Sequence, residues 1–211
     1  QIMKKILIST VLIIFFIGCS TSKITNSWKL SNMPVKKYNK IMVIGLIKNN
    51  DRDLRGKMEN HLVADLAEFG YAGISSLNEF GPKSFENSKE VEVLTKLGNS
   101  AVDAVITIVL LDKQKEKYYI PGRVYYSPYI IYQRRFWGYY TTIYDRVYTP
   151  GYYREDTKYF WESNFYDIET KELLYSAQTK SFDPGSAESL AHEYGQIILN
   201  DMVKQGVLQK K

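Results

Sequence analysis

Apolar and polar residues alternate in blocks along the chain, and the blocks predict strands separated by helices. Residues 40–47 (KIMVIGLI) and 104–111 (AVITIVLL) are nearly continuous apolar runs, which is typical of buried strands. A helix is predicted after the first run, beginning at Asp51 or Asp53 and ending at Gly70. Its apolar residues recur every three or four positions and share one face: Leu54, Met58, Leu62, Leu66 and Phe69. Residues 71–75 predict a short strand, and residues 88–97, followed by Gly98, a second helix.

The second half predicts a hairpin and a closing helix. Residues 159–168 and 173–182 flank the turn 169–172 and indicate two antiparallel strands. The last helix, over about residues 186–205, carries an apolar stripe: Ala187, Leu190, Ala191, Tyr194, Ile197, Ile198 and Met202. The order β-α-β-α-β, hairpin, helix predicts an α/β (α+β) fold, with a mixed sheet in a single domain over residues 38–211.

The first twenty residues have the pattern of an export signal. Lys4 and Lys5 precede residues 6–17, which are apolar except for Ser9 and Thr10 and are too few to span a bilayer. The run Phe16-Ile17-Gly18-Cys19 resembles the lipobox of bacterial lipoproteins, although Phe16 stands where that family usually has Leu. The resemblance implies removal of residues 1–18 and attachment of diacylglyceryl and an acyl chain such as palmitate to Cys19, the only cysteine. The alternative is an ordinary cleaved signal peptide beside a chance cysteine.

The residues after Cys19 bear on location. Ser20 follows it and no acidic run is present, a pattern that in such lipoproteins implies an outer-membrane anchor with the domain facing the periplasm. Residues 19–37 are polar and predict a tether, within which Trp28 is expected to fold back onto the domain.

Charge and cysteine content limit the partners and the stabilising bonds that the chain can have. Without residues 1–18 the chain keeps 26 basic and 23 acidic residues, a net charge of +3 (26 − 23) and no basic run, so nucleic acid is not an expected partner. With Cys19 lipidated no disulfide can form, and stability must come from the core.

The element order also resembles a mixed α/β domain found in envelope proteins. These are the curli-secretion lipoprotein, the amino-terminal domain of the Tol-system translocation protein, and small outer-membrane lipoproteins of unknown function. The likeness lies in YNKIMVIGL (38–46), which leads into a helix, and in the hairpin FYDIETKELLYS (165–176). It implies a fold and not an activity.

A tyrosine-rich insert, at about residues 118–157, is the most unusual segment. Residues 118–166 hold 14 of the 18 tyrosines and 19 aromatic residues in all, interleaved with arginines. Tyr, Trp and Arg are the residue types enriched at binding hot spots. The candidate binding residues are Tyr125, Tyr126, Tyr129, Tyr132, Arg134, Arg135, Trp137, Tyr139, Tyr140, Arg146, Tyr152 and Tyr153.

Three interpretations of the insert stay open. The tyrosines could pack over the sheet as a subdomain, form a recognition surface for protein or glycan, or insert into a membrane as a hairpin. Paired tyrosines, prolines and Arg134-Arg135 interrupt the alternation that a membrane strand requires.

No catalytic, metal or cofactor motif occurs. His61 and His192 each lack a second histidine at helical spacing, and Gly45 stands without a phosphate-binding loop. Asp145, Asp156 and Glu155 could serve as acid and base in glycan cleavage.

From the export signal, the aromatic insert and the lack of a catalytic motif, we expect a non-enzymatic, lipid-anchored binding domain of the envelope. The alternatives are an oligomeric accessory subunit of an outer-membrane secretion or assembly complex and, third, a cell-wall glycan enzyme.

Overall fold

The computed structural model describes residues 21–33, 36–83, 85, 88–120 and 152–210. The chain divides into two compact units, one of Gln1–Lys113 with Tyr159–Lys211 and the other of Gln114–Lys158. Within the described residues, six strands form one sheet in the order β1-β6-β5-β4-β2-β3. The strands are β1 (Ser22–Lys29), β2 (Lys40–Leu46), β3 (Ala72–Ser75), β4 (Ala104–Ile120), β5 (Tyr152–Asp167) and β6 (Leu173–Phe182).

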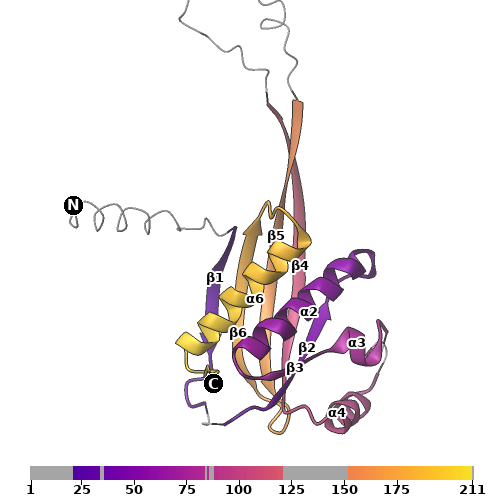
Figure 1. Ribbon diagram of the computed structural model, residues 1–211, viewed down its shortest axis with the longest axis vertical. Coiled ribbons are helices and arrows are strands. Elements are labelled where there is room, and N and C mark those ends of the chain that lie inside the picture. The colour runs from indigo at the N-terminus through magenta and orange to yellow at the C-terminus, as the bar shows by residue number, and fades with distance from the viewer. Residues whose placement is uncertain (1–20, 34–35, 84, 86–87, 121–151, 211) are drawn as a thin grey trace, which may run out of the picture. The chain divides into compact units, whose positions relative to one another are not determined.

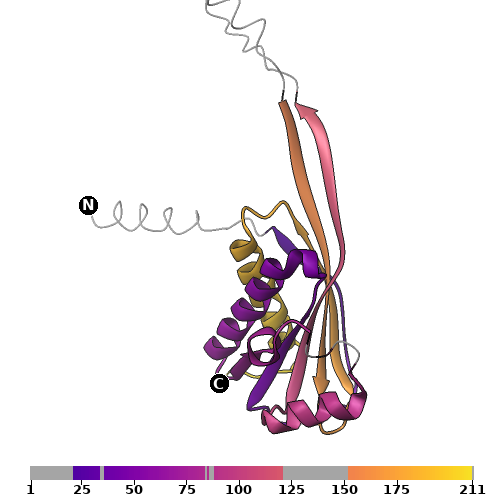
Figure 2. The ribbon, with the colours of Figure 1, turned by 90° about the vertical axis from the view of Figure 1, so that its right-hand side faces the viewer.

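The helices of the first unit cover the sheet unequally. They are η2 (Asn49–Asp51), α2 (Arg52–Glu68), α3 (Ser76–Phe80), α4 (Glu90–Asn99) and α6 (Ala187–Lys204). Figures 1 and 2 show α2 and α6 side by side on one face of the sheet. On the opposite face, Leu97 of α4 packs with Met42 of β2 and Val105 of β4 in a smaller cluster.

The main core lies between the sheet and the pair α2 and α6. β2 runs parallel to both β3 and β4, as the apolar runs predicted, and β1 runs antiparallel to β6. All five apolar positions predicted along the first helix are buried. β5 contributes Trp161 and Phe165, both with no exposed surface, and α6 contributes Tyr194. The predicted α+β fold with a mixed sheet is therefore confirmed.

The turn between β5 and β6 shows why an aspartate stands there. Asp167 Oδ1 accepts hydrogen bonds from the backbone N–H groups of Glu169 and Thr170 at 2.8 and 2.9 Å. Its other oxygen contacts Lys36 Nζ at 2.8 Å and accepts from Tyr38 Oη at 3.1 Å. Burial acts to raise the pKa of this carboxyl, but Lys36, the Thr170 N–H and Tyr38 together hold it below its ordinary value.

The prediction of a tether over residues 19–37 is wrong for residues 22–29, which form β1. The segment has no apolar alternation, and its pairing with β6 supplies the stabilisation instead. Ser22 Oγ and Ser181 Oγ lie 2.7 Å apart in a buried hydrogen bond, and the register continues to Lys29 opposite Tyr175. A polar sequence suits a strand at the end of a sheet, because its other edge faces solvent and should not attract another chain. Trp28 lies in β1 and is 46% exposed.

Other elements differ from the predictions as well. Residues 76–80 form α3, where no helix is predicted, and Ser75 caps this helix by accepting from Asn78 N. α4 includes Gly98 and ends at Asn99 instead of ending before Gly98. β4 continues nine residues past Leu111, and β5 begins seven residues before Tyr159, so both ends of the expected insert are strand.

Candidate binding surface

The candidate surface is built on the unit Gln114–Lys158, whose described parts are the end of β4 and the start of β5. β4 and β5 are neighbours in the sheet. Residues 114–119 and 152–155 are all exposed. A strand pair exposed in this way buries too little to be stable by packing alone.

Ion pairs between the two strands fix their register. The carboxylate of Glu155 forms ion pairs with Lys115 Nζ at 2.7 Å and with Lys117 Nζ at 3.3 Å. Lys158 Nζ lies 2.6 Å from the carboxylate of Glu116. In Figure 2 the arrows of β4 and β5 point in opposite directions, so the two strands are antiparallel. Hydrogen bonds from Lys115 and Lys117 lower the pKa of Glu155.

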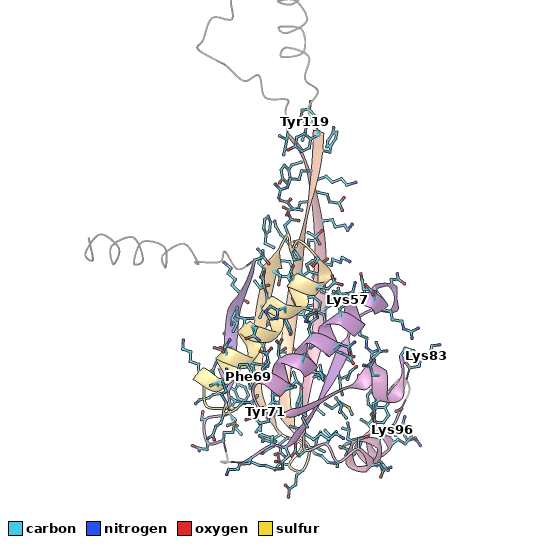
Figure 3. All side chains as sticks on the ribbon, viewed as in Figure 1. Lys57, Phe69, Tyr71, Lys83, Lys96 and Tyr119 are labelled. Carbon is cyan, nitrogen blue, oxygen red and sulfur yellow. The ribbon has the colours of Figure 1, made fainter. Side chains whose placement is uncertain are left out.

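Four tyrosines lie on these strand ends. Tyr118, Tyr119, Tyr152 and Tyr153 are exposed by 40, 54, 61 and 76% respectively. Tyr119, which Figure 3 labels near the end of β4, has its ring centroid 5.3 Å from that of Tyr153. Beside them, Lys117, Tyr153, Arg154 and Glu155 line a hollow of about 520 Å³. Because successive side chains of a strand alternate between its two faces, Tyr119 and Tyr153 lie with Lys117 on one face, and Tyr118 lies with Arg154 on the other.

Asp156 orients Tyr118 and Arg154, two residues of this surface. It is 5% exposed, and its oxygens accept hydrogen bonds from Tyr118 Oη and Arg154 Nε, both at 2.9 Å. A buried carboxylate that holds a phenol and a guanidinium restricts their rotation. It therefore lowers the entropy that each would lose on contacting a ligand.

Of the predicted binding residues, Tyr152 and Tyr153 lie in the described part of the chain, and both are exposed strand residues. The other ten lie outside the described residues: Tyr125, Tyr126, Tyr129, Tyr132, Arg134, Arg135, Trp137, Tyr139, Tyr140 and Arg146. Cys19 and Asp145 lie outside them as well. The interpretation that tyrosines pack over the sheet does not describe Tyr152 or Tyr153.

Tyr118 and Tyr119 were missed as surface residues because the apolar run ends at Leu111 and the strand was expected to end there. A signal was nevertheless present. Lys113, Lys115 and Lys117 recur at every second position, which is the period of a strand with alternating sides. Continuing the strand along that alternation would have brought Tyr118 and Tyr119 opposite the residues that precede Tyr159.

The carboxylates proposed for glycan cleavage have other roles where the structure describes them. A general acid needs a pKa raised toward neutrality, whereas that of Glu155 is lowered. Asp156 is engaged by Tyr118 and Arg154. No group of three or more His, Cys, Asp or Glu residues suited to a metal ion occurs in the described part of the chain.

A buried carboxylate occupies the place where many α/β proteins bind ligands, the carboxyl end of the parallel strands. Glu59 of α2 has no exposed surface and accepts from Gly45 N at 2.8 Å, Leu77 N at 2.8 Å and Ser75 Oγ at 2.6 Å. Arg55 Nε lies 2.9 Å from its Oε1. A Cβ at Gly45 would lie 2.9 Å from that oxygen, so this position needs glycine. The arrangement ties α2 to β2 and α3 and fills the position with protein atoms.

The two histidines, far apart in the sequence, come together between α2 and α6. The ring centroids of His61 and His192 are 6.4 Å apart, and His192 Nδ1 lies 3.7 Å from Asp65 Oδ1. Asp65 is 3% exposed and also accepts from Gln196 Nε2 at 2.8 Å. Burial raises the pKa of its carboxyl. Sequence spacing could not reveal this cluster, because α2 and α6 meet only in the folded chain.

None of the helices in the described residues is long and apolar enough to cross a membrane.

Comparison with known proteins finds likeness in structure only. No protein-family model matches the sequence, and no curated protein matches it. Among solved structures, the PelC dodecamer from Paraburkholderia phytofirmans aligns at 11% identity and a TM-score of 0.42, covering 90% of this chain and 98% of that one. Lipoprotein GNA1162 from Neisseria meningitidis aligns at 14% identity and a TM-score of 0.43, covering 79% of this chain and 99% of that one. A PDZ domain protein from Parabacteroides distasonis aligns at 12% and 0.36, covering 91% and 36%. Likeness of this degree assigns no family and says nothing about what this chain binds.

Proposed function

We propose that this chain is a lipid-anchored domain of the cell envelope that binds another envelope component, protein or glycan, through its tyrosine-rich surface. The observation that carries the proposal is the exposure of Tyr118, Tyr119, Tyr152 and Tyr153 on two paired strands. The surface continues in sequence into residues 121–151, where most of the predicted binding residues lie.

The rings of Tyr118, Tyr119 and Tyr153 are held in place although their side chains are exposed. Tyrosine has only two side-chain torsions, so it contributes a large contact area at a small entropic cost. The hydrogen bond to Asp156 holds Tyr118, the rings of Tyr119 and Tyr153 contact each other, and the ion pairs of Glu155 align the two strands. A partner that covered either face of the strand pair would gain apolar burial, with Lys117 on one face and Arg154 on the other available for charged or hydroxyl groups.

The anchor is proposed from the lipobox, Gly18-Cys19-Ser20 with Phe16 and Ile17 before it. We infer lipidation at Cys19, retention at the outer membrane and exposure of the domain to the periplasm. Several acyl chains on one residue would hold the protein at the membrane stably, whereas a single chain is marginal.

A second candidate is an accessory subunit that acts as an oligomer in a secretion or assembly complex. Exposed apolar residues of the first unit, Trp28 at 46% and Leu111 at 52%, favour it, since self-association would cover them. If this function is correct, the lipidated protein extracted in mild detergent should sediment as a multimer in analytical ultracentrifugation. A monomer at high concentration contradicts it.

Photocrosslinking in intact cells tests the binding function. A diazirine amino acid placed at Tyr153 should give a covalent adduct with one envelope component, identified by mass spectrometry as peptide or sugar. The matched control is Val91 of α4, which is 74% exposed in the first unit. Adducts at Tyr153 but not at Val91 support the proposal. Equal capture at both sites, or none at Tyr153, contradicts it.

A further inference from the structure

Thr21, two residues after Cys19 in the sequence, is fixed to the folded domain. Thr21 N and Thr21 Oγ1 both donate to Glu193 Oε2 of α6, at 2.9 and 2.8 Å, and Thr21 O accepts from Phe182 N at 2.9 Å. Two residues of chain span at most about 7 Å. A lipid on Cys19 would therefore enter the membrane close to the start of β1 and the end of β6. This replaces the longer reach that a tether over residues 19–37 would have allowed.

Two lysines stand opposite each other at this end of the sheet. Lys23 of β1 and Lys180 of β6 are register partners, so their side chains project from the same face. Like charges opposite each other on neighbouring strands repel, and neither lysine forms an ion pair with the residues that the structure describes. Lys180 Nζ lies 5.4 Å from the ring centroid of Phe160. An anion bound between the two lysines would relieve their repulsion.

An exposed aromatic residue completes the surface. Phe182 follows Lys180 by two positions in β6, which places it on the same face, and it is 44% exposed. Thr21, Ser22, Lys23, Lys180 and Phe182 line a hollow of about 220 Å³. Of the nearby acids, Glu193 accepts from Thr21 and Glu162 accepts from Gln178 and Asn164.

We propose that Lys23, Lys180 and Phe182 form a membrane-contact surface that binds the headgroups of anionic phospholipids. The two ammonium groups suit a phosphate, and an aromatic ring beside them suits the boundary between headgroups and acyl chains. The surface would set the orientation of the first unit on the membrane, while the anchor sets only its distance. The inference rests on the proposed lipidation of Cys19.

The test uses the full lipidated chain in vesicles. Since Cys19 is the only cysteine and its thiol would be consumed by the lipid, Phe182→Cys provides a unique site for an environment-sensitive fluorophore. The control is Val91→Cys, an exposed position on α4. In vesicles that contain phosphatidylglycerol, the label at position 182 should shift to the blue and be quenched by headgroup spin-labelled lipid. The label at position 91 should behave as in water.

The charge requirement is tested in the same background. Lys23→Glu with Lys180→Glu should remove the shift, and the parent should show a weaker shift in vesicles of phosphatidylcholine alone. If the double variant unfolds, Lys23→Gln with Lys180→Gln replaces it, and half of the charge-dependent shift or more should still be lost. A label at 182 that responds like the label at 91, or equally in neutral vesicles, overturns the proposed surface. A mass spectrum that shows an unmodified Cys19 instead overturns the anchor, so the two failures are distinguishable.

Discussion

The two halves of β4 form a comparison within one strand. In residues 104–108 of β4, Ala104, Ile106 and Ile108 have no exposed surface and pack into the core of the first unit. In the second half, residues 114–119 are all exposed, and their contacts with β5 include ion pairs, an aromatic contact and the hydrogen bond from Tyr118 to Asp156. Both halves are strand, but only the first half is stabilised by burial of apolar side chains.

The difference separates the part that holds the fold from the part that meets solvent. Apolar burial stabilises the unit that contains α2 and α6. An exposed ion pair contributes from zero to about 1 kcal/mol, so the pairs of Lys115, Lys117 and Lys158 can align the second unit but can stabilise it only slightly. Exposed tyrosines on such a framework add little to folding, and this is why we propose contact with another molecule as their role.

The largest expected loss of stability comes from emptying the core. Trp161 has no exposed surface and contacts the rings of Tyr159 and Tyr194, at 5.9 and 5.6 Å between centroids. Trp161→Ala should lower the free energy of unfolding by about 3–5 kcal/mol, because it leaves a cavity. Urea denaturation followed by circular dichroism measures this. A loss below about 1 kcal/mol would mean that the core is not where the structure places it.

The buried carboxylate of Glu59 should come next. Glu59 accepts from five groups, the N–H of Gly45 and Leu77, Arg55 Nε and the hydroxyls of Ser75 and Ser76. Glu59→Gln replaces one of its oxygens by an amide that must donate, which leaves a buried donor unsatisfied. The expected loss is about 1–3 kcal/mol in the same denaturation experiment. Glu172→Gln, in the exposed turn between β5 and β6, is the matched control and should change stability by less than about 0.5 kcal/mol. Equal effects of the two substitutions would contradict a structural role for Glu59.

Two buried aspartates should give opposite pH dependences. Burial raises the pKa of Asp65, so its contribution is most favourable below the ordinary carboxyl pKa and is lost as pH rises through the raised value. The pKa of Asp167 is lowered, so its contribution is present above the ordinary value and is lost as pH falls through the lowered one.

Unfolding free energies measured from about pH 3 to pH 7 would check both signs. Asp65→Asn should remove a decrease in stability toward neutral pH, and Asp167→Asn should remove a decrease toward acid pH. The same change of slope in both variants would show that one of the two environments is misassigned.

The sequence predicted the first unit better than the surface, for a physical reason. Most residues of 40–47 and of 104–108 are buried by parallel neighbours and by helices, and such segments can be recognised in the sequence as nearly unbroken apolar runs. β1 cannot be recognised in this way, since its polar side chains carry no burial signal and its pairing partner lies more than 140 residues later in the chain. The continuation of β4 was missed for the same reason: an exposed strand has no apolar face.

For the candidate surface, composition identified the residue types and the fold supplied their arrangement. Tyr152 and Tyr153 were predicted from their enrichment alone, and the structure shows them exposed. The contact between the rings of Tyr119 and Tyr153, and the support of Tyr118 by Asp156, depend on a register that no local pattern encodes.

Stability and binding can be measured together in one variant, Tyr119→Ala with Tyr153→Ala, and this experiment tests the binding role of the tyrosines. We expect a free energy of unfolding within about 0.5 kcal/mol of the parent, because neither ring is buried. We also expect loss of the envelope adduct when the diazirine is placed at Tyr152 of this variant, while the parent labelled at Tyr152 retains it. A loss of stability above about 2 kcal/mol with the adduct kept would contradict the proposed binding role, because the tyrosines would then serve packing and not contact.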